Sequence, residues 1–85
     1  MKSKPYPLTL YGRVYCSLCQ HMLQHLQAAI EQGVVCVQFV DVDEDEGLIA
    51  RYDELVPVLV DDSGNELCHW YFDAEAFSAY LARMG

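Results

Sequence analysis

The hydrophobic and polar positions of the first half of the chain change period twice, which predicts a strand, a helix and a strand. Residues 7–11 form a short β-prone run that ends at Gly12. Residues 18–32 carry apolar side chains at helical spacing, and Gly33 supplies a stop. Residues 34–42 are rich in β-branched side chains, which favours a buried strand. Together these segments have the size of a βαβ unit with a parallel crossover.

The middle of the chain predicts a short helix. The acidic run 43–46 begins it, and Leu48, Ile49 and Tyr52 supply its apolar positions. Carboxylates in a first turn suit the positive end of the helix dipole. We prefer this interpretation to calcium binding, because the spacing lacks the twelve-residue loop with its glycine and terminal glutamate.

The last third of the chain predicts a hairpin and a helix. Residues 56–60 form a third strand with Pro57 at its start, residues 61–65 are turn-formers, and residues 66–71 form a fourth strand. Asp73 can cap a final helix. The inward stripe of that helix consists of Phe77, Tyr80, Leu81 and Met84.

The resulting order is β-α-β-α-β-β-α, without an internal repeat or a linker. The compact packing arrangement of these elements is an α/β fold with a four-stranded mixed sheet and helices on both faces. We therefore expect a single domain over residues 1–85, in which residues 1–6 form a loose N-terminal extension.

Composition narrows the function classes. Hydrophobic residues make up 53% of the chain and charged residues 21%, as in a packed globule. The net charge of −8 argues against nucleic-acid binding, which needs a surplus of Lys and Arg. No apolar run approaches the roughly 18 residues of a membrane span, and no signal-peptide pattern follows Lys2 and Lys4. We expect a cytoplasmic monomer.

The charge is unevenly distributed along the sequence. Residues 1–30 contain Lys2, Lys4 and Arg13 but no carboxylate, and all thirteen acids lie from Glu31 onward. The general interpretation of this distribution is an acidic soluble surface. The more specific one is that the segment around Cys16 comes from the only part of the chain without negative charge.

Cys16 and Cys19 form a C-x-x-C motif between the first strand and the first helix. Residues i and i+3 of a helical turn lie about 5–6 Å apart, within reach of a disulfide. Cys16, at the helix start, faces unsatisfied backbone N–H groups and the positive dipole end, which favour a thiolate. Arg13 adds a nearby cation, and Cys19, one turn inside, should be more buried and act as the resolving thiol.

Two structural alternatives compete with redox chemistry. A zinc site needs a second ligand pair, and Cys36, Cys68 and the three histidines form no second C-x-x-C or C-x₂₋₄-H motif. A disulfide framework belongs to secreted domains with poor cores. His21 and His25 are interpreted as a polar helix face. Cys36 and Cys68 should not pair, because their strands are expected at opposite edges of the sheet.

The C-x-x-C after the first strand, combined with Val56-Pro57 before the third, resembles the glutaredoxins of the thioredoxin superfamily. The resemblance spans residues 8–81, and it includes the compact, uncharacterised bacterial glutaredoxin-like proteins. It implies a thioredoxin-like fold, a cis bond before Pro57, and packing of Pro57 beside the Cys16 sulfur. It also implies that the backbone of Val56 receives an extended substrate.

The sequence departs from the glutaredoxin pattern in two places. Ser17-Leu18 stands where glutaredoxins have Pro-Tyr. Residues 70–72 are Trp-Tyr-Phe where a Gly-Gly pair is common, and only Asp73 matches the glutathione-binding segment. Asp53 and Glu54 would repel glutathione carboxylates. The aromatic residues have a plain interpretation as packing residues, and a docking surface is the alternative.

The sequence thus predicts a thiol–disulfide oxidoreductase that reduces protein or glutathione-mixed disulfides through Cys16 and Cys19. Arg13, Val56, Pro57 and Asp73 are the predicted substrate-positioning residues. No metal and no tightly bound cofactor is expected, although glutathione is a candidate co-substrate and a reductase a candidate partner. The alternatives are a thioredoxin-like docking module with little redox activity and a zinc-binding module.

Overall fold

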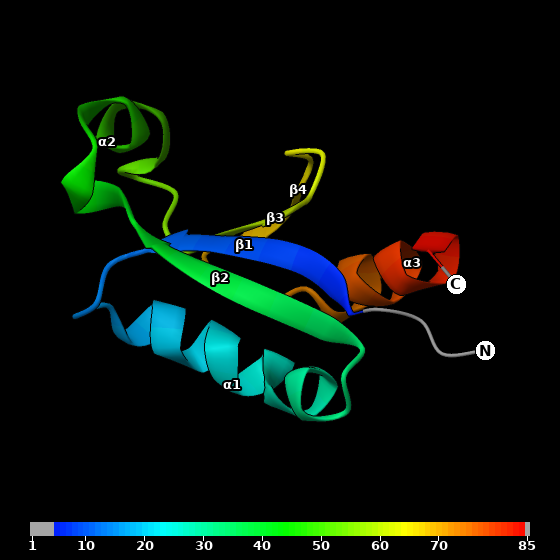
Figure 1. Cartoon of the computed structure of the whole chain (residues 1–85). Helices are drawn as coiled ribbons and strands as arrows, with labels where there is room; N and C mark the ends of the chain where they lie inside the picture. The colour runs from blue at the N-terminus through cyan, green and yellow to red at the C-terminus, as the bar shows by residue number, and fades with distance from the viewer. Residues whose placement is uncertain (1–4, 85) are drawn as a thin grey trace.

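The computed structural model describes residues 5–84 and has the predicted order of elements (Figure 1). The helices and strands are β1 (Tyr6–Gly12), α1 (Ser17–Glu31), β2 (Val35–Asp41), the 3-10 turn η1 (Val42–Glu44), α2 (Glu46–Tyr52), β3 (Val58–Asp61), β4 (Glu66–His69) and α3 (Ala74–Met84).

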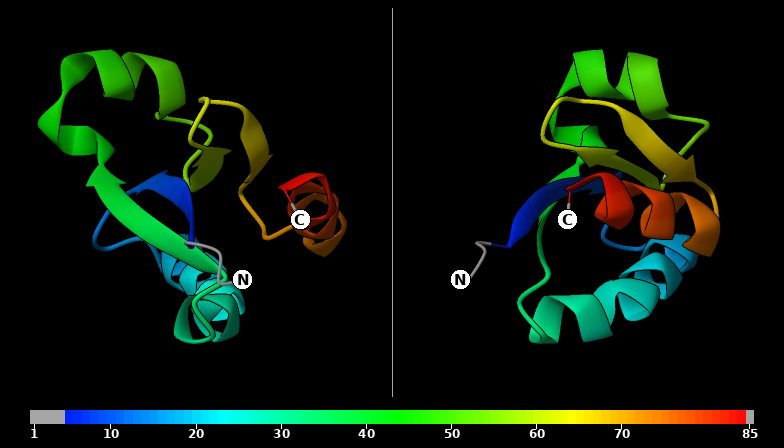
Figure 2. Two further views of the ribbon diagram at one scale, coloured as in Figure 1. Left: turned by 45° about the vertical axis from the view of Figure 1, so that its right-hand side comes forward. Right: turned by 90° about the vertical axis from the view of Figure 1, so that its right-hand side faces the viewer.

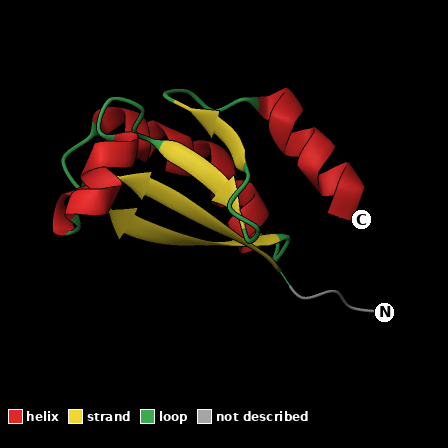
Figure 3. Ribbon diagram, turned by 90° about the horizontal axis from the view of Figure 1, so that it is seen from above, coloured by secondary structure: helices red, strands yellow, loops and turns green. Residues whose placement is uncertain are grey.

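The four strands form one mixed sheet in the order β2-β1-β3-β4. Strand β1 pairs with β2 in parallel, so the first three elements are the predicted βαβ unit. Strands β1 and β3 are antiparallel, as are β3 and β4. Seen from above in Figure 3, the arrowheads of the two long strands point toward α2. The ends of β1 and β2 therefore lie at one end of the sheet, where the loops that follow them meet.

Alternating side chains of the strands build a core on each face of the sheet. Leu10 and Leu59 pack on one face with Leu26 of α1 and Tyr80 of α3, and all four are at most 1% exposed. Val58 and Val60 face the other way and pack with α2. Figure 2 (right) shows α2 above the sheet and α1 and α3 below it. Helices therefore cover both faces, as predicted, and each buried aliphatic side chain stabilises the fold by about 1.5–3 kcal/mol.

The predicted N-terminal extension, residues 1–6, wrongly includes Tyr6. Tyr6 belongs to β1 and pairs with Val35. Its hydroxyl donates to the Met84 carbonyl at 3.0 Å, and its ring meets Tyr80 edge-on at 6.2 Å. The ring thus joins the start of β1 to α3, which a hydrophobicity pattern around residues 5–7 cannot indicate. Residues 1–4 of this prediction lie outside the described residues.

Element boundaries also differ from the sequence prediction, and β3 begins at Val58 rather than at residue 56. Strand β4 ends at His69 rather than residue 71, because Trp70 has a φ of 65° and leaves the extended conformation. Helix α2 begins at Glu46, after the Asp45 carboxylate caps the N–H groups of Gly47 and Leu48. The earlier part of the acidic run forms η1 instead. None of the helices in residues 5–84 is long and apolar enough to cross a membrane.

Candidate active site

Cys16 is the N-cap residue of α1. Its backbone is extended (φ −92°, ψ 117°), and its Sγ accepts a hydrogen bond from the Cys19 N–H at 3.3 Å. Its carbonyl accepts the first helical bond, from the Gln20 N–H at 3.3 Å. The Cys16 side chain thus meets the unsatisfied N–H groups of the first turn, as the sequence predicts. Cys16 is half-buried.

Cys19 lies one turn further along and is 1% exposed. Burial and a hydrogen bond with Cys16 raise the pKa of the Cys19 thiol to about 11. The greater burial expected of the second cysteine is therefore confirmed. Both cysteines are free thiols, as are Cys36, which is exposed on β2, and Cys68, which is buried on β4.

Gly12 at the end of β1 makes room for the Cys19 sulfur. A Cβ at this position would lie 2.5 Å from Cys19 Sγ and 3.2 Å from Cε1 of Phe39. Sequence reasoning treated Gly12 only as the end of a strand. Its position directly before the C-x-x-C loop is the signal that could have indicated a close approach. A hollow of about 250 Å³ opens beside Cys19, lined also by Arg13, Val14, Gln20, Leu23 and Phe39.

Arg13 holds the cysteine loop to two other segments. Its Nε donates to Asp43 Oδ1 at 2.9 Å, and its Nη2 donates to Asp53 Oδ1 at 2.6 Å. The Tyr15 hydroxyl donates to the other Asp43 oxygen at 3.1 Å, and this bond raises the pKa of Tyr15. Hydrogen bonds to Asp43 and Asp53 raise the pKa of Arg13 as well. The Arg13 carbonyl accepts from the Cys16 N–H at 3.1 Å, so the anchored residue also fixes the start of the motif.

The segment before β3 contains the predicted proline. The peptide bond between Val56 and Pro57 is cis. The Pro57 carbonyl accepts a hydrogen bond from the Trp70 N–H at 2.9 Å, and the Trp70 indole N–H donates to the Glu54 carbonyl at 2.8 Å. The N–H of Val56 donates to the Tyr52 carbonyl at 3.1 Å, which leaves only the Val56 carbonyl for an added substrate strand.

Asp73 acts locally as the cap of the last helix. Its Oδ1 accepts from the Ala76 N–H at 3.0 Å, and its carbonyl accepts from Phe77. The capping prediction is confirmed, whereas a contact of Asp73 with substrate stays a prediction. The preceding residue, Phe72, stacks on His25 at 5.1 Å. His25 is nine residues beyond Cys16. The contact between Phe72 and His25 therefore lies roughly 13 Å further along the axis of α1, at 1.5 Å per residue.

The aromatic residues after β4 divide into two groups. Phe72 is half-buried and packs on Phe77, which fits the packing interpretation. Trp70 is 46% exposed but still meets the His69 ring edge-on at 4.8 Å, whereas Tyr71 is 68% exposed. Within residues 5–84, no group of three or more His, Cys, Asp or Glu side chains is arranged to hold a metal ion.

Comparisons with known proteins agree with this geometry. The family model "Glutaredoxin-like domain (DUF836)" matches residues 7–82. This chain belongs to that glutaredoxin-like family. The solution NMR structure of protein Ne2328 from Nitrosomonas europaea is 32% identical, with a TM-score of 0.83 over 95% of this chain and 96% of that one. The X-ray structure of protein XcR50 from X. campestris is 38% identical, with a TM-score of 0.73 over 89% and 96%.

A more distant likeness concerns the fold of this glutaredoxin-like domain. Thioredoxin 1 from Thermosipho africanus is 19% identical, with a TM-score of 0.59 over 92% of this chain and 97% of that one. The thioredoxin-like fold is therefore confirmed. Among curated proteins, no match is found.

Proposed function

We propose that this glutaredoxin-like domain is a thiol–disulfide oxidoreductase that uses Cys16 as nucleophile and Cys19 as resolving thiol. The observation that carries the proposal is the position of the two sulfurs. The half-buried Cys16 caps α1, and the buried Cys19 donates its N–H to the Cys16 sulfur at 3.3 Å. A helix N-terminus favours a thiolate, which is the reactive form in disulfide exchange.

The proposed cycle transfers two electrons to the substrate. The Cys16 thiolate attacks one sulfur of a substrate disulfide and forms a mixed disulfide with it. The substrate S–S bond breaks, and the released sulfur takes a proton from water. Cys19 then loses its proton and attacks Cys16 Sγ, which forms the Cys16–Cys19 bond and releases the second substrate thiol. The substrate is reduced and the domain is oxidised; a low-molecular-weight thiol or a reductase would restore the dithiol.

The environment of Cys19 suits this order of events. Burial first, and then its hydrogen bond with Cys16 and the charge of Cys16, raise the pKa of Cys19. The two contributions of Cys16 depend on a free Cys16 sulfur. Once Cys16 is bonded to substrate they are removed, so Cys19 ionises more readily when it is needed. We place this cycle in a reducing compartment such as the cytoplasm, where thiols are kept reduced.

The test is to trap the mixed disulfide. The Cys19→Ser variant, incubated with a disulfide-bonded peptide, should accumulate a covalent adduct at Cys16, whereas wild type should turn over and Cys16→Ser should form no such adduct. Cys36→Ser is the matched control, because Cys36 is exposed on β2 and should be dispensable. Adduct formation on Cys36 alone, or none at all, would contradict the proposal and favour a docking module.

Two further alternatives have their own measurements. Glutathione-mixed disulfides are compared with peptide disulfides as substrates, and the exposed carboxylates of Asp53 and Glu54 lead us to expect slower reaction of the anionic glutathione substrate. Metal analysis of protein purified under reducing conditions tests the zinc alternative. About one zinc per chain, bound by the two motif cysteines, would overturn disulfide exchange.

A further inference from the structure

The sheet register gathers four segments at one end of the molecule. Tyr11 pairs with Val40 on one side and with Val58 on the other, and Val58 pairs with His69. These pairs form one row across the sheet. The cysteine loop after β1, the acidic run after β2, the segment before β3 and the aromatic residues after β4 therefore all lie beyond that row. We call this the cysteine end of the domain.

Large apolar side chains are exposed mainly at the cysteine end. Val14, Tyr15, Trp70 and Tyr71 are 67%, 75%, 46% and 68% exposed. Within the described residues only one other large apolar side chain, Met84, is exposed, and it lies near the start of β1 at the opposite end. A cluster of exposed apolar side chains around a reactive group is typical of an interaction surface.

The two apolar pairs are tied to a single loop, residues 53–57. Arg13, adjacent to Val14 and Tyr15, bonds to Asp53 of this loop. Trp70, adjacent to Tyr71, donates its indole N–H to the Glu54 carbonyl and its backbone N–H to the Pro57 carbonyl. The pairs therefore lie around the same loop, and hydrogen bonds to two of its carbonyls fix Trp70 there.

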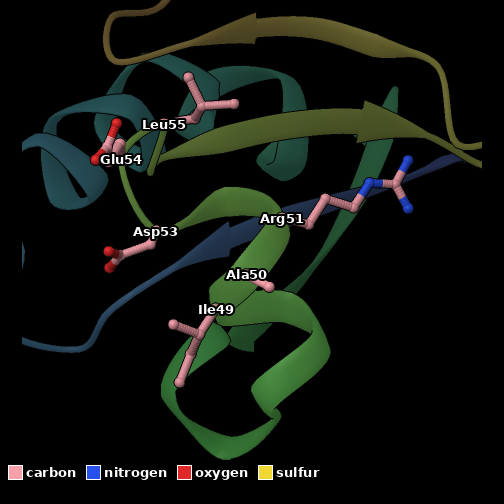
Figure 4. A pocket seen from close by; sticks show the side chains of 6 residues that line it. All are labelled: Ile49, Ala50, Arg51, Asp53, Glu54 and Leu55. Atoms are coloured by element: carbon pink, nitrogen blue, oxygen red, sulfur yellow. The ribbon is translucent and has the colours of Figure 1, made fainter.

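The same surface carries an excess of negative charge. Residues 41–54 contain seven acids and a single cation, Arg51. Arg51 lies over the Tyr52 ring, 5.2 Å from its centroid. Arg51, Asp53 and Glu54 line an open hollow, and Figure 4 shows that Arg51 points away from the two carboxylates. Arg13 supplies one positive charge against the two carboxylates that it binds. Negative charge is left unmatched next to the apolar side chains.

We propose that the cysteine end is the docking surface for a polypeptide disulfide whose cysteine is flanked by aromatic or aliphatic residues and by Lys or Arg. This inference rests on the proposed function, and it names the substrate class. Exposed Tyr and Trp side chains provide the contact area typical of binding hot spots. The unmatched carboxylates attract a cationic segment during encounter and disfavour an anionic one.

The experiment compares two peptide disulfides that differ only in charge. Both carry Leu and Tyr next to the cysteine, one has flanking Lys and the other flanking Glu, and kcat/KM is measured at low and moderate salt. We expect the Lys peptide to be preferred by about tenfold at low salt, because charge steering changes association rates by that order. The preference should shrink as salt screens the charges.

Reduction of neutral bis(2-hydroxyethyl) disulfide separates the two levels of the proposal. No reaction with this compound or with either peptide would contradict the oxidoreductase function itself. Reaction with it, combined with equal kcat/KM for the two peptides or a preference for the Glu peptide, would overturn only the substrate class.

Two surface variants locate the preference. Glu54→Gln keeps the backbone carbonyl that Trp70 uses but removes a charge, and Tyr71→Ser removes an exposed ring. Both should raise KM for the Lys peptide and leave reduction of the neutral disulfide unchanged. Asp62→Asn and Met84→Ser remove a charge and an apolar side chain at the opposite end and serve as matched controls. Equal effects of the surface and control variants would overturn the assignment of the surface.

Discussion

The reactive pair depends on a residue that has no side chain. A methyl group at Gly12 would lie 2.5 Å from Cys19 Sγ, and the neighbouring atoms, including Phe39, leave it little room. Gly12→Ala should therefore destabilise the domain by about 1–3 kcal/mol, as overpacking of a core does. Displacement of Cys19 should also slow resolution, so the mixed disulfide at Cys16 should persist. Urea unfolding and adduct lifetime measure the two effects.

A double-mutant cycle identifies the clash. In a Cys19→Ala background the sulfur that Gly12 faces is absent, so adding Gly12→Ala should cost less free energy than it does in wild type. Equal costs in the two backgrounds would show that the Cys19 sulfur is not what Gly12 accommodates.

The pH dependence of stability reports on Cys19. Burial first, and then its hydrogen bond with Cys16, raise the pKa of this thiol from 9.0 to about 11. Between these values the unfolded state has released the proton and the folded state has not, so stability falls as pH rises. The free energy of unfolding of the reduced wild type, minus that of Cys19→Ala, should be largest below pH 9 and decrease toward pH 11. A difference that is constant over this range would contradict the raised pKa.

At the residue scale, sequence reasoning worked where the interaction is local. Cys16 and Cys19 are three residues apart on one helical turn, so their geometry follows from helix periodicity. Arg13 bonds to residues 30 and 40 positions away, and nothing in a local pattern indicates such partners. The local pattern therefore assigns the acidic run to the dipole of α2, whereas Asp43 binds the cysteine loop through Arg13 and Tyr15. The local pattern likewise gives no sign of the left-handed backbone conformation of Trp70.

At the scale of elements, Asp73 determines where α3 begins. Its carboxylate accepts from the Ala76 N–H at 3.0 Å. Asp73→Ala should cost about 1 kcal/mol of unfolding free energy because one helical N–H loses its partner. Asp73→Asn keeps a capping oxygen and should cost much less. If the two variants are equally destabilised, the charge of Asp73 matters and not its cap; urea unfolding distinguishes these outcomes.

The order of the elements was predictable because the hydrophobic side chains of each segment recur at the spacing of a helix or a strand. The boundaries of the elements were less predictable, since they depend on single hydrogen bonds and dihedral angles. Asp45, rather than Asp43, caps α2, and all four candidate acids look alike in a hydropathy pattern. The end of β4 depends on Trp70, whose left-handed conformation is unusual for an aromatic residue.

At the scale of the whole molecule, the sheet order separates the two cysteines outside the motif. Cys36 lies on β2 and Cys68 on β4, the two edge strands, with β1 and β3 between them. Three interstrand spacings of about 4.8 Å separate the two strands by roughly 14 Å, far beyond the reach of a disulfide. The prediction that their strands lie at opposite edges is confirmed.

Controlled oxidation turns this separation into a measurement. Mild oxidation of the monomer should produce one intramolecular disulfide, Cys16–Cys19, and leave Cys36 and Cys68 as free thiols. Burial raises the pKa of Cys68, so it should also be alkylated more slowly than the exposed Cys36. Peptide mapping by mass spectrometry, with Cys16→Ser as the control that cannot close the motif, reads out both results. A Cys36–Cys68 peptide from monomeric protein would require a different strand order, and the row of paired residues that gathers the cysteine end would then not exist.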